Sequence, residues 1–86
     1  GKHEVRVAGE SVAFTATELR LLHFLATHPG RVFTRDRLLS RVIGEDVVVV
    51  DRNIDVHIRA VRKKLGDSAD LIETIRGVGY RFREDE

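Results

Sequence analysis

The chain has 86 residues, with 15 Lys and Arg against 14 Asp and Glu, which gives a formal net charge of +1 at pH 7. This length suits one small domain with a modest core. Cys is absent, which excludes disulfides, thiolate metal sites and cysteine nucleophiles, and no run approaches the roughly 18 apolar residues of a membrane span.

Positive charge is unevenly distributed along the chain. Residues 51–83 carry eight Lys and Arg against five Asp and Glu, while the terminal run Glu84-Asp85-Glu86 lowers the total. A binding partner meets this local charge rather than the net value. The chain contains no Met and therefore no initiator residue, so we expect residues 1–86 to be a single domain of a longer protein.

The first elements predicted are a β-hairpin and a helix. Apolar and polar residues alternate over residues 3–14 around Gly9-Glu10, which favours a hairpin. Thr15 and Glu18 have the spacing of a capping box, in which the Thr side chain and the Glu side chain each bind the other residue's backbone N–H. A helix is therefore expected over about residues 16–28.

A second helix is expected after a short extended link at Val32-Phe33. Thr34 is a candidate N-cap, and apolar residues at helical spacing continue to about residue 43. Gly44 is a plausible residue to end this helix. We therefore predict a helix over about residues 35–43.

The next segment has no helical polarity, because four consecutive valines favour an extended backbone. An exposed valine run would be an aggregation hazard. One interpretation is a strand that pairs within the domain, and the other is a protein interface, for a different protein or for a second copy of the chain. The predicted partner loop comprises Glu45, Asp46, Val47, Val48 and Val49, and the valine run ends at Val50.

A third helix is predicted over residues 52–65, with Asp51 as its N-cap and Gly66 just past its end. At about 100° per residue, four apolar residues form one narrow stripe: Ile54, Ile58, Val61 and Leu65. The opposite face carries three cations and one valine: Arg52, Val56, Arg59 and Lys63. A helix with one buried stripe and a cationic far face suits a polyanion.

The last predicted element is a second β-hairpin, over residues 71–83, whose strands join through Arg76-Gly77-Val78-Gly79. The whole order predicts an α+β fold of the winged helix-turn-helix class. It has a three-helix core, an N-terminal β-hairpin or small antiparallel sheet, and a C-terminal β-hairpin wing. The third helix would enter the major groove of double-stranded DNA.

The sequence also resembles a known family. Two strings, residues 51–65 (DRNIDVHIRAVRKKL) and residues 75–82 (IRGVGYRF), resemble the DNA-binding effector domain of OmpR/PhoB-type response regulators, in the PhoB-like branch. The match extends to Thr15-x-x-Glu18 and to residues 31–39. The family's effector domain opens with a four-stranded sheet, whereas only two strands fit before Thr15. Ile43 stands where an aromatic residue is common, and Ala60 stands where some members have a third cation.

The resemblance implies a transcription factor of a bacterial two-component system, cytoplasmic and associated with the nucleoid. Its phospho-acceptor receiver domain is absent from this chain. The implied partners are promoter direct repeats in double-stranded DNA, a second copy bound head-to-tail, and RNA polymerase, with no membrane. Regulation of transcription would then follow from sequence-specific DNA binding.

The candidate DNA-binding residues lie at the start of the second predicted helix, on the third helix and on the wing. Arg52 and Arg59 are expected to read base edges or to bind phosphate, and Val56 to contact a thymine methyl rather than to be buried under a loop. Lys63 is expected to bind phosphate. We expect Arg76 in the minor groove, where negative potential is concentrated. The remaining candidates for phosphate or base contact are Thr34, Arg35, Asn53, His57, Arg62, Thr74 and Tyr80.

Several of these residues have a structural alternative. Asn53 could simply belong to the first turn, His57 could be a packed histidine, and Tyr80 could be anchored in the core. Arg35 could lie on a solvated helix face. Asp55 is expected to hold Arg59 and Arg62 in fixed rotamers.

Nothing in the sequence points to an enzyme. We find no nucleophile with a base, no metal-ligand cluster and no phosphate-binding glycine loop, so no catalytic residue, cofactor or metal is expected. The alternative function is a winged-helix protein-interaction module whose cationic face docks an acidic partner.

Overall fold

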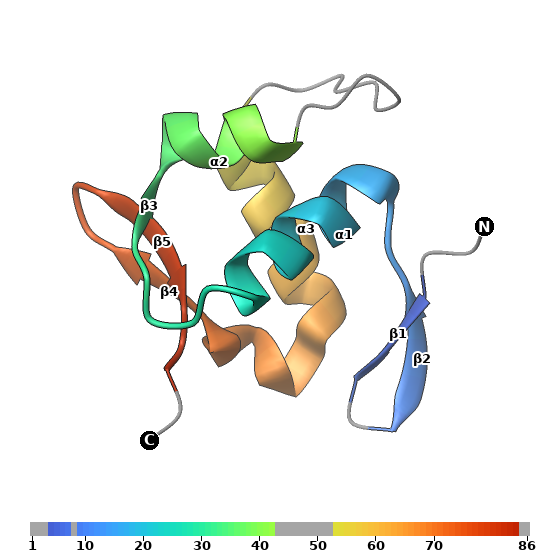
Figure 1. The fold of residues 1–86 in the computed structure, drawn as a ribbon. Coiled ribbons are helices and arrows are strands. Elements are labelled where there is room, and N and C mark those ends of the chain that lie inside the picture. Colours follow the sequence, from blue (N-terminus) through green and yellow to red (C-terminus); the bar gives the residue numbers. More distant parts are fainter. Residues whose placement is uncertain (1–3, 8, 43–52, 85–86) are drawn as a thin grey trace.

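The computed structural model describes residues 4–7, 9–42 and 53–84. Within these residues, three α-helices lie between two small antiparallel sheets, with the N-terminal hairpin on one side and the sheet that contains the wing on the other (Figure 1). The predicted α+β winged-helix architecture is confirmed. The predictions for Ile43, Gly44, the partner loop at residues 45–49, Val50 and Arg52 lie outside the described residues.

The N-terminal hairpin pairs β1 (Glu4–Val7) with β2 (Glu10–Ala13). Val5 faces Val12 in the register, as the alternating pattern predicted. Gly9 has φ of 84°, a left-handed conformation that suits glycine at the turn. Both valines are half-buried and pack against the helical core.

Helix α1 (Ala16–Ala26) begins with the predicted capping box. The Glu18 backbone N–H donates to Thr15 Oγ1 at 3.1 Å, and the Thr15 N–H donates to Glu18 Oε1 at 2.9 Å. The helix ends two residues earlier than predicted, because the N–H of Thr27 already caps its C-terminus by bonding the carbonyl groups of His23 and Leu25.

Glu18 also fixes the position of the third helix. Its carboxylate forms an ion pair with Lys64, on the last turn of α3 (Ile54–Leu65). Burial opposes ionisation of Glu18, but the hydrogen bonds from Lys64 and Thr15 and the Lys64 charge outweigh it and lower the pKa of Glu18. The residue that caps α1 therefore also holds the C-terminal end of α3.

Helix α2 (Arg35–Val42) starts as predicted, with Thr34 Oγ1 accepting from the Arg37 N–H at 3.2 Å. Helix α3 starts two residues later than predicted. Its N-cap is Asn53 rather than Asp51, because the Asn53 side chain accepts a hydrogen bond from the Asp55 N–H. Gly66, with φ of 59°, follows the helix as expected.

The link after α3 is a 3₁₀ helix, η1 (Gly66–Leu71). The wing consists of β4 (Ile72–Ile75) and β5 (Gly79–Phe82), close to the predicted range. A two-residue strand that the sequence did not reveal, β3 (Phe33–Thr34), pairs with β5. The strand order β3-β5-β4 joins the wing to the start of α2.

The core confirms the predicted apolar stripe of α3. Ile54, Ile58, Val61 and Leu65 are each at most 5% exposed. They pack with buried residues from the segment between β2 and α1, from α1 and α2, and from the wing sheet: Phe14, Leu21, Leu22, Leu25, Phe33, Leu38, Val42, Ile72 and Tyr80. Because one face of α3 is fully buried, its opposite face must point outward.

Candidate nucleic-acid interface

The outward face of α3 presents the residues that the helical pattern predicted. Val56 is 45% exposed, and Arg59 and Lys63 are exposed on the same face. Of the two alternatives for Val56, exposure is the one that the structure shows. A cationic face with a central aliphatic group can reach phosphates and the methyl group of thymine.

The wing adds a second exposed group. Arg76 is exposed at the turn between β4 and β5, where Gly77 has φ of 76° and the Val78 N–H donates to the Ile75 carbonyl at 3.0 Å. Val78 is 45% exposed beside it. Sequence reasoning gave Val78 no role, since one valine in a turn carries no pattern.

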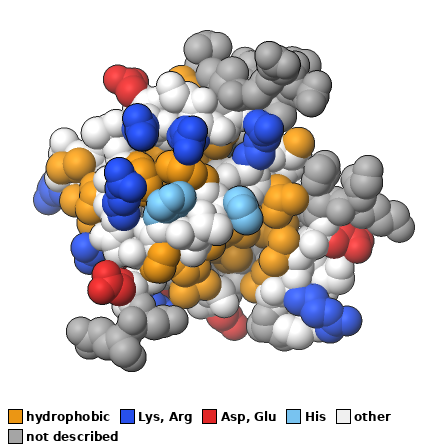
Figure 2. Space-filling view, in the orientation of Figure 1, with side chains coloured by type: hydrophobic (Ala, Val, Ile, Leu, Met, Phe, Trp, Pro, Cys, Tyr) orange, Lys and Arg blue, Asp and Glu red, His pale blue; other side chains and the backbone are white. Residues whose placement is uncertain are grey.

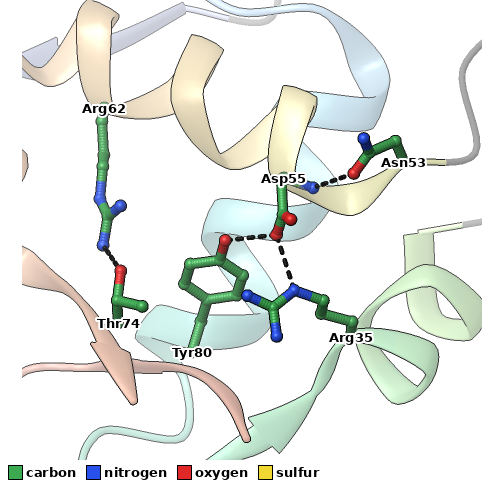
Figure 3. A network of polar contacts seen from close by, with 6 residues as sticks. All are labelled: Arg35, Asn53, Asp55, Arg62, Thr74 and Tyr80. Atoms are coloured by element: carbon green, nitrogen blue, oxygen red, sulfur yellow. Dashed lines mark hydrogen bonds and ion pairs between the residues drawn. The ribbon is translucent and has the colours of Figure 1, made fainter. Parts of the chain in front are cut away.

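Asn53 belongs structurally to the first turn of α3. Its Oδ1 accepts from the Asp55 N–H at 3.0 Å and satisfies one of the free donors at the helix N-terminus (Figure 3). Asn53 therefore has the structural role that was its alternative, and contact between Asn53 and DNA stays a prediction. His57 is half-buried beside the apolar stripe, so its phosphate contact also stays a prediction.

Asp55 does not hold the two arginines that the sequence suggested, and that prediction was wrong. Its Oδ1 instead accepts a hydrogen bond from Arg35 Nε, at 2.9 Å, and another from the Tyr80 hydroxyl (Figure 3). These partners come from α2 and β5, and they lie 20 and 25 positions away in the chain. Asp55 therefore joins three elements at the start of α3.

The hydrogen bond from Tyr80 lowers the pKa of Asp55, and the bond and charge of Arg35 and the charge of Arg59 add to this against opposing burial. Burial and the contact with the Asp55 carboxylate raise the pKa of Tyr80. Both groups therefore keep their charge states, carboxylate and phenol, at neutral pH. Tyr80 is only 5% exposed, so its ring occupies the core position that was its structural alternative.

Arg62 connects α3 to the wing. Its Nη2 donates to the Ile72 carbonyl at 2.6 Å and to Thr74 Oγ1 at 2.8 Å, and Figure 3 shows the side chain reaching from α3 to Thr74. Arg62 Cζ also lies 5.5 Å from the centre of the Tyr80 ring. These contacts hold the wing against α3, and the DNA contacts expected of Arg62 and Thr74 stay predictions.

Positive charge also occurs away from the exposed face of α3. Figure 2 shows Lys and Arg side chains around two histidines over α1 and α2. A shallow hollow of about 400 Å³ is lined there by Arg20, His23, Phe24, Thr27, His28 and Arg41. Arg41 Cζ lies 5.0 Å from the centre of the Phe24 ring, so the Arg41 guanidinium is stacked on a ring that packs against the core.

The described part of the chain shows neither a metal-binding cluster nor a membrane-spanning helix. No group of three or more His, Cys, Asp or Glu side chains there could hold a metal ion. None of the helices described is long and apolar enough to cross a bilayer.

Comparison with known proteins gives consistent results. Residues 9–82 match the family described as "Transcriptional regulatory protein, C terminal". The chain is 48% identical over 82 residues to the phosphate regulon transcriptional regulatory protein PhoB of Escherichia coli strain K12. That match covers 93% of this chain and 36% of PhoB, so the chain spans about a third of the length of this relative.

Two solved structures of DNA-binding domains with DNA are similar. The domain of the response regulator AdeR, in complex with an intercistronic region, has a TM-score of 0.77 at 30% identity, covering 96% of this chain and 87% of AdeR's. The domain of Klebsiella pneumoniae RstA, in complex with the RstA box, has a TM-score of 0.74 at 39% identity. The match covers 93% of this chain and 82% of the RstA chain. The fold seen here is thus one found in DNA complexes.

Proposed function

Because this chain belongs to the family of transcriptional regulatory protein C-terminal domains, the OmpR/PhoB-type effector domains, we propose that it binds double-stranded DNA sequence-specifically and thereby regulates transcription. The observation that carries the proposal is the outward face of α3, where Val56, Arg59 and Lys63 are exposed opposite a fully buried stripe. The DNA complexes of AdeR and RstA support it.

In this proposal α3 lies in the major groove and the wing reaches the minor groove. Arg59 reads a base edge, Val56 contacts a thymine methyl and Lys63 binds phosphate. Arg76 enters the minor groove from the wing tip. Thr34 and Arg35, at the start of α2, bind the backbone, as the first helix of a helix-turn-helix pair does. The remaining proposed contacts are made by Arg52, Asn53, His57, Arg62 and Thr74.

The function of the longer protein is also a proposal, since its relative PhoB is much longer than this chain. We infer a two-component response regulator that acts in the cytoplasm of a bacterium. Its domains would occupy promoter direct repeats as head-to-tail pairs. The segment at residues 45–49 would contact RNA polymerase.

Salt dependence tests the DNA-binding proposal. Each phosphate contact releases counterions, so with five or six contacts the log of the binding constant should fall against log salt with a slope of about −5. The measurement is a fluorescence-anisotropy titration at several salt concentrations, with a duplex selected from random DNA and a shuffled control. A flat response, or equal affinity for both duplexes, would refute sequence-specific binding.

The second candidate is a protein-interaction module. The basic hollow over α1 and α2, with Arg20 and Arg41 on its rim, favours it because the hollow lies outside the proposed DNA contacts. The same titration separates the two functions. A module of this kind would show weak DNA binding with no preference between the selected and shuffled duplexes.

A further inference from the structure

Asp55 is the only acid within Ile54–Leu65, the helix proposed to face DNA. Its side chain is 47% exposed. A carboxylate near a phosphate backbone is repelled by it, so an acid at this place is unfavourable unless it improves another contact. Asp55 is bonded to Arg35, so the contact that it can improve is one between Arg35 and DNA.

Arg35 is held at two points. Asp55 Oδ1 accepts from its Nε at 2.9 Å, and its Cζ lies 5.3 Å from the centre of the Tyr80 ring. The ring is itself buried, and its hydroxyl donates to the same Oδ1. Together these contacts set both the position and the plane of the guanidinium. Nε is bonded to Asp55, and a guanidinium oriented in this way can offer its terminal N–H groups to a phosphate.

The position of Arg35 at the N-terminus of α2 is one that can bind a phosphate. Arg35 is the first residue of the helix, next to the Thr34 cap. The helix dipole disfavours a cation at this end and favours an anion. A phosphate bound there would be stabilised by the dipole and by Arg35 together, provided that Arg35 stays in place. Asp55 supplies the charge that keeps it there in the absence of DNA.

We propose that Asp55 is a positioning residue for DNA binding: it holds Arg35 against Tyr80 so that the guanidinium meets a backbone phosphate already in its bound rotamer. The inference rests on the proposed function. Ordering a long side chain on binding costs free energy, and a side chain that is ordered beforehand avoids part of that cost. Asp55→Asn should therefore weaken DNA binding about three- to tenfold.

The direction of the change in DNA affinity distinguishes a positioning role of Asp55 from that of an ordinary surface acid. If Asp55 were an ordinary surface acid, removing its negative charge would leave DNA binding unchanged or strengthen it. Asp36→Asn is the matched control, because Asp36 is an exposed acid in the first turn of α2, adjacent to Arg35. We expect Asp36→Asn to bind DNA as tightly as the unmodified chain or more tightly. The assay is the anisotropy titration on the selected duplex, with thermal unfolding of each variant as the check on folding.

Coupling to Arg35 is the second measurement. Arg35→Gln should weaken binding and reduce the magnitude of the salt slope by about 1. Adding Asp55→Asn to Arg35→Gln should cause no further loss, since Asp55 acts through Arg35. Additive losses, or an Asp55→Asn variant that binds as well as the unmodified chain, would overturn the inference.

Arg35→Lys covers the case in which Asp55→Asn does not fold. Lysine keeps the charge and can pair with Asp55, but it lacks the planar fork, so we expect a similar three- to tenfold loss. Wild-type affinity in Arg35→Lys would contradict the proposal. Such results in the variants would contradict the role of Asp55 but not the proposed function. The proposed function itself would be contradicted if the unmodified chain showed no salt-dependent, selective DNA binding.

Discussion

Replacing Arg59 by alanine should weaken binding to the selected duplex by about 1–3 kcal/mol, or roughly 5- to 150-fold, the range for losing a good contact to a base edge. Arg59 is exposed on the outward face of α3, one turn beyond Val56. A guanidinium there can bind the O6 and N7 atoms of guanine together. The loss should be largest on the selected duplex and much smaller on the shuffled one.

The comparison between duplexes distinguishes the two kinds of contact that Arg59 can make. An equal loss on both would identify Arg59 as a phosphate contact. Arg20→Ala is the control, because Arg20 is an exposed arginine on α1, in the basic hollow rather than on α3. It should change affinity little. An Arg59→Ala variant with the affinity of the unmodified chain would contradict the assignment of the α3 face.

Replacing Gly79 by alanine should lower the free energy of unfolding by about 1–3 kcal/mol or more, the cost of forcing extra atoms into a packed site. A Cβ at this position would lie 2.0 Å from the Phe33 carbonyl oxygen and 2.9 Å from its carbon. Both are backbone atoms, which cannot rotate away as a side chain can. The β3–β5 pairing, in which Thr34 faces Gly79, would have to separate.

The measurement is chemical and thermal unfolding of the Gly79→Ala variant. In a domain of this size each kcal/mol shifts the melting temperature by about 4–8 °C, so the melting temperature should fall by about 4–24 °C. Gly77→Ala is the control: its Cβ would meet no atom within 4 Å, although its φ of 76° carries some backbone strain. If Gly79→Ala were no less stable than Gly77→Ala, the close approach of β3 and β5 would be wrong.

The helices could be predicted from the sequence because their signals are local. The capping box at Thr15 and Glu18 and the stripe from Ile54 to Leu65 involve residues three to eleven positions apart, within single helices. The predicted start of α3 was wrong by two residues, because both Asp51 and Asn53 are good N-cap residues. The structure shows Asn53 in that role, and spacing alone could not decide between them.

The wing sheet and the contacts of Asp55 could not be predicted in the same way. β3 has only two residues, too few to show an alternating pattern. The helical wheel placed Asp55 near Arg59 and Arg62, and proximity within one helix suggested them as partners. Its observed partner Arg35 lies 20 positions away and is brought close only by the packing of α2 on α3.

The face of the molecule that meets DNA is the central claim, and NMR can measure it directly. Amide shifts of the ¹⁵N-labelled chain would be followed while the selected duplex is added. The account predicts that the largest changes occur at Val56, Arg59 and Lys63 on α3 and at Arg76 on the wing. Changes centred instead on Arg20 and Arg41 over α1 and α2, with α3 and the wing unaffected, would contradict it.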